Sequence, residues 1–199
     1  MDVYKAALSR RSIRRFKDKP VPYDALEKCI NAARLAPSGM NRQPCEYMII
    51  DDEQLLPKVF DTITRWAGQP KPKGTLLEHT PKAYIIILIN RALEAEIVGN
   101  QRLTIYDVGL AAENIILVAL EQGLGSCPML AFDRDELRQV LNIPESYDIA
   151  LLVSLGYPDE SPVAEESTGS VERWADDQGV SHVPKRRLDD ILHRKKFQG

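Results

Sequence analysis

The sequence predicts a layered domain of the α/β type, in which helices pack on a sheet of buried strands. Short apolar runs that are typical of strands alternate along the chain with longer segments whose apolar residues recur at helical spacing. The composition, with 44% hydrophobic and 28% charged residues, is that of a globular protein. A length of 199 residues suits one domain, or one domain with an arm.

The first half of the chain is expected to contain three helices and two strands. The helices are predicted over residues 3–8, 23–36 and 55–66, and prolines bound the second of them at both ends. The strands are predicted over residues 46–50 and 83–89. The second strand reads AYIIILI, and this unbroken apolar run indicates burial on both faces of a sheet.

The second half begins with the strongest helical pattern of the chain, over Thr104–Gln122. Its side chains are apolar nearly all round, so this helix is expected to lie at the centre of the core. Gly123 is placed to cap it, and GLGSCPMLAF is expected to turn into a strand. A helix over Asp135–Leu141 with Asp133 as its N-cap follows, and then a buried strand over residues 149–157.

Residues 158–184 are polar, rich in Glu, Ser and Asp, and show little periodicity. Such a stretch is too long for an ordinary loop, so we interpret it as an arm, a lid or disorder. A basic segment over residues 185–199 ends the chain.

Bulk properties exclude several classes of function. A net charge of −3 and a pI near 5.7 disfavour a nucleic-acid-binding protein. The three cysteines are widely spaced, form no CxxC pair and share no ligand spacing with the histidines, so we predict no metal site and a cytoplasmic location. No apolar run approaches the roughly 20 residues that a membrane-spanning helix needs, so we expect no membrane partner.

Four arginines crowd into the stretch SRRSIRRF of this acidic chain. A guanidinium suits phosphate oxygens, so one explanation is a bound small anion, and the other is a solvated basic turn. If the stretch is extended, Arg10, Ser12 and Arg14 share one face, while Arg11 and Arg15 point the other way. If it is helical, Arg10 and Arg14 are still neighbours. Neither a GxGxxG nor a GxxxxGK[ST] loop accompanies these arginines.

Four blocks of sequence, in this order, resemble the FMN-dependent nitroreductase family. They are RRSIRRF, the loop and strand APSGMNRQPCEYMII, the helix and turn DVGLAAENIILVALEQGLGSCPMLAF, and the strand LLVSLGYP with the tail KRRLDDILH. The resemblance implies an α+β fold with a central mixed β-sheet flanked by helices. It also implies a single domain over residues 1–199, in which an arm at about 158–184 wraps the partner subunit of a homodimer.

The resemblance further implies FMN as cofactor, NADH or NADPH as reductant and a small-molecule electron acceptor such as a nitroaromatic or a quinone, in a ping-pong reaction. The residues expected to hold the FMN phosphate are Arg10, Arg11, Ser12 and Arg14, together with Lys185 and Arg187. The loop residues expected at the flavin, contributed from the partner subunit, are Pro37, Ser38, Gly39 and Asn41, with Gln43 nearby. Pro128, Met129 and Leu130 are expected along the ring, and the backbone N–H of Leu130 is expected to face flavin N5, the catalytic position.

Some residues depart from the family pattern. Cys45 stands where the family usually has tryptophan, and Leu130 replaces a residue that is often glycine or acidic. The chain between Asn90 and Tyr106 is short, which reduces the lids over the flavin. Asp107 on the core helix is interpreted as a polar group that is bonded within the dimer.

Two alternatives stay open. The same scaffold resembles relatives that dehalogenate substrates, reduce enones or fragment flavin, and the four blocks do not separate these reactions. The other alternative is a non-enzymatic protein whose arginine cluster binds an acidic ligand or partner.

Overall fold

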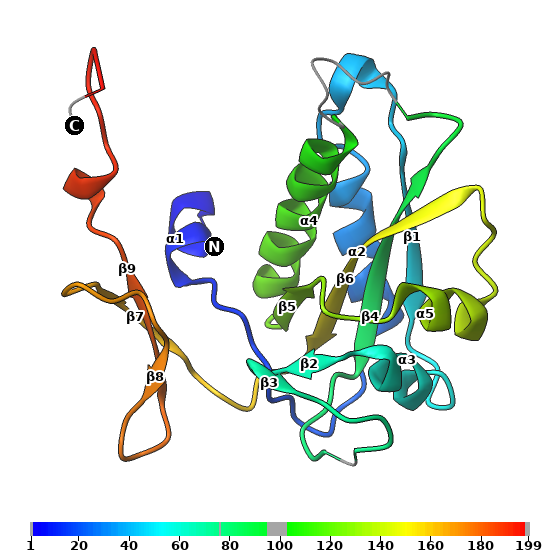
Figure 1. Cartoon of the computed structure of the whole chain (residues 1–199), viewed down its shortest axis with the longest axis horizontal. Coiled ribbons are helices and arrows are strands. Elements are labelled where there is room, and N and C mark those ends of the chain that lie inside the picture. The colour runs from blue at the N-terminus through cyan, green and yellow to red at the C-terminus, as the bar shows by residue number, and fades with distance from the viewer. Residues whose placement is uncertain (1, 76, 95–102, 198–199) are drawn as a thin grey trace. The chain divides into compact units, whose positions relative to one another are not determined.

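A four-stranded sheet forms the centre of residues 1–159 (Figure 1). Its strands, in spatial order, are β1 (Cys45–Ile50), β4 (Ala83–Asn90), β6 (Tyr147–Gly156) and β5 (Gly125–Met129). The computed structural model that contains this sheet describes residues 2–75, 77–94 and 103–197. The α+β class that the family resemblance implies is confirmed.

The direction of the strands corrects the predicted mixed sheet. Each neighbouring pair in this sheet is antiparallel. β4 and β5 run in the same direction and are joined through α4 (Thr104–Glu121), but β6 lies between them and runs the opposite way. Apolar runs separated by a helix indicate buried strands. They do not indicate that a later strand will insert between two earlier ones.

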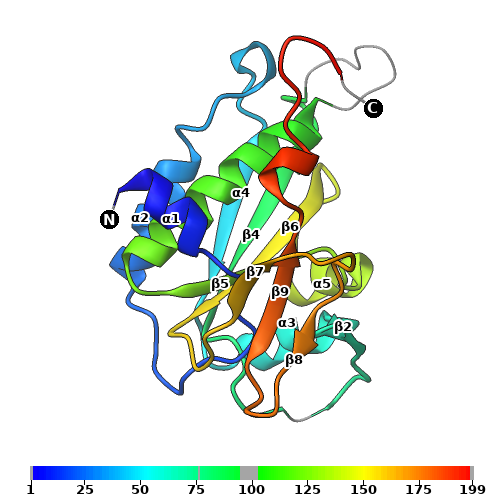
Figure 2. The same cartoon turned by 90° about the vertical axis from the view of Figure 1, so that its left-hand side faces the viewer.

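Helices cover both faces of the sheet (Figures 1 and 2). On one face, α2 (Tyr23–Ala33) and α4 pack on Ile85, Ile87 and Ile89 of β4. On the other, α3 (Leu56–Thr62) and α5 (Arg134–Leu141) pack on the alternate residues of the same strand, from Tyr84 to Leu88. Side chains alternate along a strand, so the run AYIIILI supplies both cores, as predicted.

The short helix α1 (Val3–Ser9) and helix α5 begin at side-chain caps. Asp2 accepts a hydrogen bond from the Lys5 amide (2.9 Å), and Asp133 accepts one from the Glu136 amide (3.0 Å). The cap on α5 was predicted. α2 ends at Ala33, three residues earlier than predicted, because the chain turns before Pro37.

Helix α3 ends at Thr62 and not at Trp66 as predicted. Ile63 forms a bridge with Phe132, and the Thr64 amide donates to the carbonyl of Ala131 (2.9 Å), so tertiary pairing stops the helix. The next residues form a small hairpin of β2 (Arg65–Trp66) and β3 (Gln69–Pro70).

Residues 160–199 make up a second compact unit with a three-stranded sheet. β9 (Ser181–Lys185) lies between β7 (Val163–Glu166), to which it is parallel, and β8 (Trp174–Ala175), to which it is antiparallel. A short 3-10 helix, η2 (Leu188–Asp190), follows. The polar stretch that we interpreted as an arm, a lid or disorder therefore contains strands of its own.

None of the helices in the described ranges combines the length and the apolar character that crossing a membrane requires.

Candidate functional site

The arginine-rich segment is extended, which excludes the helical alternative. Ser12 pairs with Ser126 of β5 in a parallel bridge, and the Ile13 amide donates to the Ser126 carbonyl (2.9 Å). The segment therefore runs along the outer edge of the sheet, beside β5.

Two apolar side chains hold this segment in place. Ile13 is 7% exposed and Phe16 is fully buried. Gly125 and Gly156 make room for them, because a Cβ atom on Gly125 would lie 2.7 Å from Ile13 Cγ1 and one on Gly156 would lie 2.8 Å from Phe16 Cδ1. Ile13 and Phe16 are both buried although they are three residues apart, so the side chains of this segment do not alternate strictly as far as Phe16.

Positive charge concentrates at Arg10 and Arg11. Burial lowers the pKa of Arg11, and repulsion from the nearby Arg10 lowers it further. Arg11 Nη1 donates to the carbonyl of Leu8 (2.8 Å), at the end of α1. The Nε atoms of Arg10 and Arg11 are buried and have no hydrogen-bond partner among the residues that the structure describes. Arg14 Nη1 donates to the Ser12 carbonyl (3.4 Å). The segment thus offers a phosphate both charge and unused donors.

The loop between α2 and β1 is tightly turned. It contains a single 3-10 turn, η1 (Gly39–Asn41), and Asn41 and Gln43 both have positive φ angles, of 53° and 51°. Ser38 Oγ accepts a hydrogen bond from the Gln43 amide (3.0 Å), and Gln43 Nε2 donates to the Asn41 carbonyl (3.4 Å). Pro37 is exposed at the start of the loop.

β5 ends with Pro128 and Met129, and Leu130 begins the turn that follows it. Met129 is buried, whereas the side chain of Leu130 is 62% exposed. Beyond it, the Asp133 amide donates to the Thr62 carbonyl (2.8 Å), which ties this turn to the end of α3. The turn therefore exposes the apolar side chain of Leu130 on a backbone that is held in place by hydrogen bonding.

The residues that we expect at the FMN phosphate and those that we expect along the flavin ring both lie along β5. Ser12 is paired with Ser126, and Leu130 lies four positions further on, which is about 13 Å of extended chain. The phosphate residues and the ring residues are thus arranged along β5, in the order that a long phosphorylated ligand requires.

The loop over residues 37–43 lies elsewhere. It contacts the start of α4 and leads into β1, whereas Leu130 directly follows β5. β1 and β5 are the two edge strands of the sheet, with β4 and β6 between them. Figure 1 shows the loop, in light blue, at one end of α4 and β5 at the other. One subunit therefore does not bring this loop and the turn at Leu130 to the same place.

Lys185 ends β9, and Arg187 follows it two residues later. Both belong to residues 160–199, and both are exposed. Arg187 Nε lies 4.0 Å from Glu166 Oε2.

The sequence model of the nitroreductase family matches residues 7–157, three quarters of the chain. The chain belongs to the nitroreductase family. An Archaeoglobus fulgidus protein provisionally named an NADH dehydrogenase/NAD(P)H nitroreductase is 32% identical over 197 residues, which cover 97% of each chain. An iodotyrosine deiodinase of Haliscomenobacter hydrossis is 27% identical over 172 residues, 76% of this chain and 77% of the deiodinase.

A solved structure extends the comparison to the fold. A Desulfovibrio desulfuricans protein provisionally named a nitroreductase, in complex with FMN, aligns with a TM-score of 0.70 and 22% identity, covering 100% of this chain and 99% of that one. This likeness shows that the chain has the nitroreductase fold.

The role of Asp107 in this nitroreductase-family chain was not predicted from the sequence. Asp107 is 5% exposed, and its Oδ1 accepts a hydrogen bond from the Gly39 amide (3.0 Å) of the loop. We interpreted it as bonded within the dimer, but its bond is to its own chain. An acidic residue in the first turn of an otherwise apolar helix was the signal that could have identified it.

The small residue Cys45 leaves space beneath the same loop. A cavity of about 140 Å³ is lined by Ser38, Gln43, Cys45 and Asp107, among others. Burial raises the pKa of Cys45 to about 11, with a further contribution from the charge of Asp107, so the thiol stays protonated at neutral pH. Asp107 Oδ2 has no hydrogen-bond partner in the described chain.

Proposed function

We propose that this protein is an FMN-dependent NAD(P)H oxidoreductase that reduces nitroaromatic, quinone or similar acceptors. Membership of the nitroreductase family supports this proposal, as do the name of the Archaeoglobus relative and the FMN complex of the Desulfovibrio neighbour. The observation that carries it is the pair of arginines Arg10 and Arg11, whose charges repel each other and whose buried Nε atoms have no hydrogen-bond partner among the described residues.

The residues present fit a phosphate at this position. A buried donor without a partner is costly, and two like charges side by side repel each other. A phosphate dianion would neutralise the charge and accept the unused hydrogen bonds. We propose that Arg10, Arg11, Ser12 and Arg14 bind it.

The loop and the turn would hold the flavin itself. We propose that Pro37, Ser38, Gly39, Asn41 and Gln43 contact the FMN of the partner subunit. The loop and the turn at Leu130 lie at opposite edges of the sheet, and this separation supports that arrangement. Asp107 would act as a positioning residue, because it fixes the Gly39 amide and so the conformation of the loop.

Bound FMN would supply the redox chemistry, taking a hydride equivalent from NADH or NADPH and passing it to the acceptor in a ping-pong sequence. The chain would orient the ring through Pro128 and Met129 and place the backbone N–H of Leu130 at flavin N5. The exposed Leu130 side chain would border the space that the nicotinamide and the acceptor occupy in turn.

We further propose that the protein works as a homodimer. Apolar side chains are exposed along α1 and α4, including Tyr4, Leu8, Ile105, Tyr106 and Leu110. Exposed patches of this kind mark interaction surfaces. Analytical ultracentrifugation should give a dimer that keeps its flavin on dilution, and a stable flavin-loaded monomer would refute this part of the proposal.

The phosphate assignment is tested by comparing FMN with riboflavin, which has no phosphate. Arg10→Ala should weaken FMN binding by roughly ten- to a hundredfold, the cost of about 1.5–3 kcal/mol for a lost hydrogen bond to a charged group. Riboflavin binding should hardly change. Arg15→Ala, an exposed arginine of the same segment, is the control. Equal losses for FMN and riboflavin would mean that Arg10 supports the fold and not the phosphate.

Reductive dehalogenation is a second candidate, which the similarity to an iodotyrosine deiodinase favours. The two functions are separated by giving the NAD(P)H-reduced protein either a halotyrosine or a quinone. Halide release with slow quinone turnover would favour dehalogenation, and the reverse result would favour the proposed function.

A further inference from the structure

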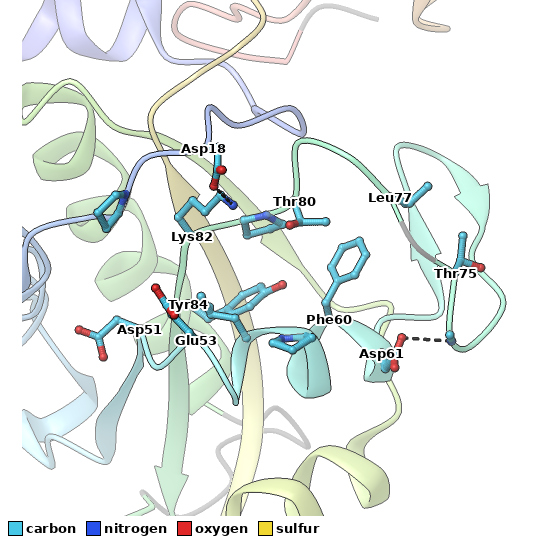
Figure 3. A pocket seen from close by; sticks show the side chains of 15 residues that line it. Asp18, Asp51, Glu53, Phe60, Asp61, Thr75, Leu77, Thr80, Lys82 and Tyr84 are labelled. Carbon is cyan, nitrogen blue, oxygen red and sulfur yellow. Dashed lines mark hydrogen bonds and ion pairs between the residues drawn. The ribbon is translucent and has the colours of Figure 1, made fainter.

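A cavity of about 460 Å³ lies at the N-terminal end of β4, next to α3 and the segment that follows β1 (Figure 3). It shares no lining residue with the groups proposed to bind FMN. Pockets that bind small molecules typically enclose about 300–1,000 Å³, so its size suits a ligand.

A buried hydroxyl without a partner belongs to its wall. Tyr84 is fully buried and lines the cavity, and its hydroxyl has no hydrogen-bond partner in the described chain. Burial raises the pKa of Tyr84 well above its usual range, so the phenol keeps its proton as a donor. Figure 3 shows this hydroxyl directed toward the side of the cavity where Phe60 lies.

The charged groups of the wall divide into paired and unpaired ones. Lys82 Nζ is 2.7 Å from Asp18 Oδ1, and Asp61 accepts a hydrogen bond from the Gly74 amide (3.1 Å). The carboxylates of Asp51 and Glu53, by contrast, have no hydrogen bond or ion pair within the described residues. The unpaired charge at the cavity is therefore negative, which favours a cation.

The rest of the wall is largely apolar. The Phe60 ring, Leu56 and three prolines contribute carbon surface. A ligand that buries carbon here gains hydrophobic stabilisation, while its polar ends must match Tyr84 and the two carboxylates.

We propose that this cavity binds an organic cation of the arylalkylamine class. Its protonated amine would meet Asp51 and Glu53, its ring would pack on Phe60, and an oxygen on the ring would accept the Tyr84 hydrogen bond. This proposal does not depend on the oxidoreductase function, because none of its residues takes part in the proposed flavin site.

Three related probes test the ligand chemistry on the purified full-length protein by calorimetric titration. Tyramine carries both the amine and the ring oxygen, phenethylamine lacks the oxygen, and 4-hydroxyphenylacetate replaces the amine with a carboxylate. Tyramine should bind roughly two- to tenfold more tightly than phenethylamine, as expected for one neutral hydrogen bond. The anion should bind most weakly. Failure of tyramine to bind at millimolar concentration, or binding of the anion with equal affinity, overturns the proposal.

Variants then locate the site. Tyr84→Phe keeps the ring, so the protein should fold normally, as a thermal melt can verify. It should remove the preference for tyramine and leave phenethylamine unchanged. Asp51→Asn combined with Glu53→Gln should weaken both amines by about two- to fivefold for each charge removed.

Asp52→Asn is the matched control. Asp52 lies between the two carboxylates, but its side chain accepts hydrogen bonds from the Gln54 and Leu55 amides and does not line the cavity. This variant should bind tyramine as the parent protein does. Unchanged tyramine affinity in Tyr84→Phe would place the amine elsewhere, including the flavin site, and would also overturn the proposal.

Discussion

The two units of this chain are stabilised in different ways. Residues 1–159 enclose two hydrophobic clusters, one on each face of the sheet. In the described part of residues 160–199, Pro184 is the only buried residue. A sheet with so little apolar burial needs other contacts to hold its strands together.

Those contacts centre on His182 of β9. Its Nδ1 lies 2.9 Å from Glu165 Oε2 of β7, and its Nε2 lies 3.4 Å from Asp176 Oδ2. The ring stacks on Trp174 of β8, with centroids 4.0 Å apart, and Trp174 Nε1 donates to Glu165 (2.7 Å). One titratable ring therefore links all three strands. The stability of this sheet should depend on pH, whereas the stability of the larger sheet should depend on the volume of its buried side chains.

The largest expected effect is the difference in stability loss between truncating a buried side chain of the first unit and an exposed side chain of the second. Ile86→Ala removes a fully buried side chain of β4 and should lower the free energy of unfolding by about 2–5 kcal/mol. Val163→Ala, at a half-exposed position of β7, should change it by less than about 0.5 kcal/mol. Urea denaturation followed by circular dichroism gives both values. Similar losses for the two variants would mean that the second unit contributes a core of its own.

A smaller effect tests how closely the N-terminal segment packs on the first unit. Gly125→Ala would place a methyl group 2.7 Å from Ile13 Cγ1 and should destabilise the protein by about 1–3 kcal/mol. Combining it with Ile13→Gly removes all three side-chain atoms that the new methyl group would meet, including Ile13 Cβ at 2.8 Å, so the double variant should be more stable than the sum of the single changes predicts. Additive losses would show that Gly125 is needed for another reason.

The smallest effect is the pH response of the second unit. The His182 ring forms a hydrogen bond to Glu165 and a second one to Asp176. Both raise the pKa of His182 above its ordinary value, and the bond to Glu165 has the larger effect. The protonated ring therefore stabilises the sheet fully below pH of about 6.5, and this contribution disappears as the pH rises through the raised pKa. The pKa values of Glu165 and Asp176 are lowered, so their contributions disappear at the acid end, as the pH falls through those values.

Hydrogen exchange of the Trp174 indole N–H, followed by NMR, reports this response directly. As the pH rises, exchange of this N–H should accelerate more steeply than the intrinsic pH dependence of a free indole predicts. Trp66, the only other tryptophan and part of the first unit, serves as an internal reference. His182→Gln should abolish the additional pH dependence. A Trp174 signal that follows Trp66 throughout would contradict the role assigned to His182.

Local sequence patterns were sufficient to predict most of the longer helices and strands. The helical spacing of Thr104–Gln122 predicted α4 within one residue, and AYIIILI predicted a strand that is buried on both faces. Both elements bury a side chain at nearly every turn or every position, so tertiary context does not oppose their local preference. By contrast, α3 ends early because residues 63–64 pair with the chain after β5, which no local pattern records.

The candidate site divides in the same way. The sequence by itself determined that arginines cluster at residues 10–15 and that the family motifs occur in order, because both are properties of neighbouring residues. Only the tertiary structure decided that the arginine segment runs along β5, that Asp107 fixes the Gly39 amide, and that β6 separates β4 from β5. Each of these depends on contacts between residues far apart in the chain, and such contacts are selected by packing and hydrogen bonding of the whole fold.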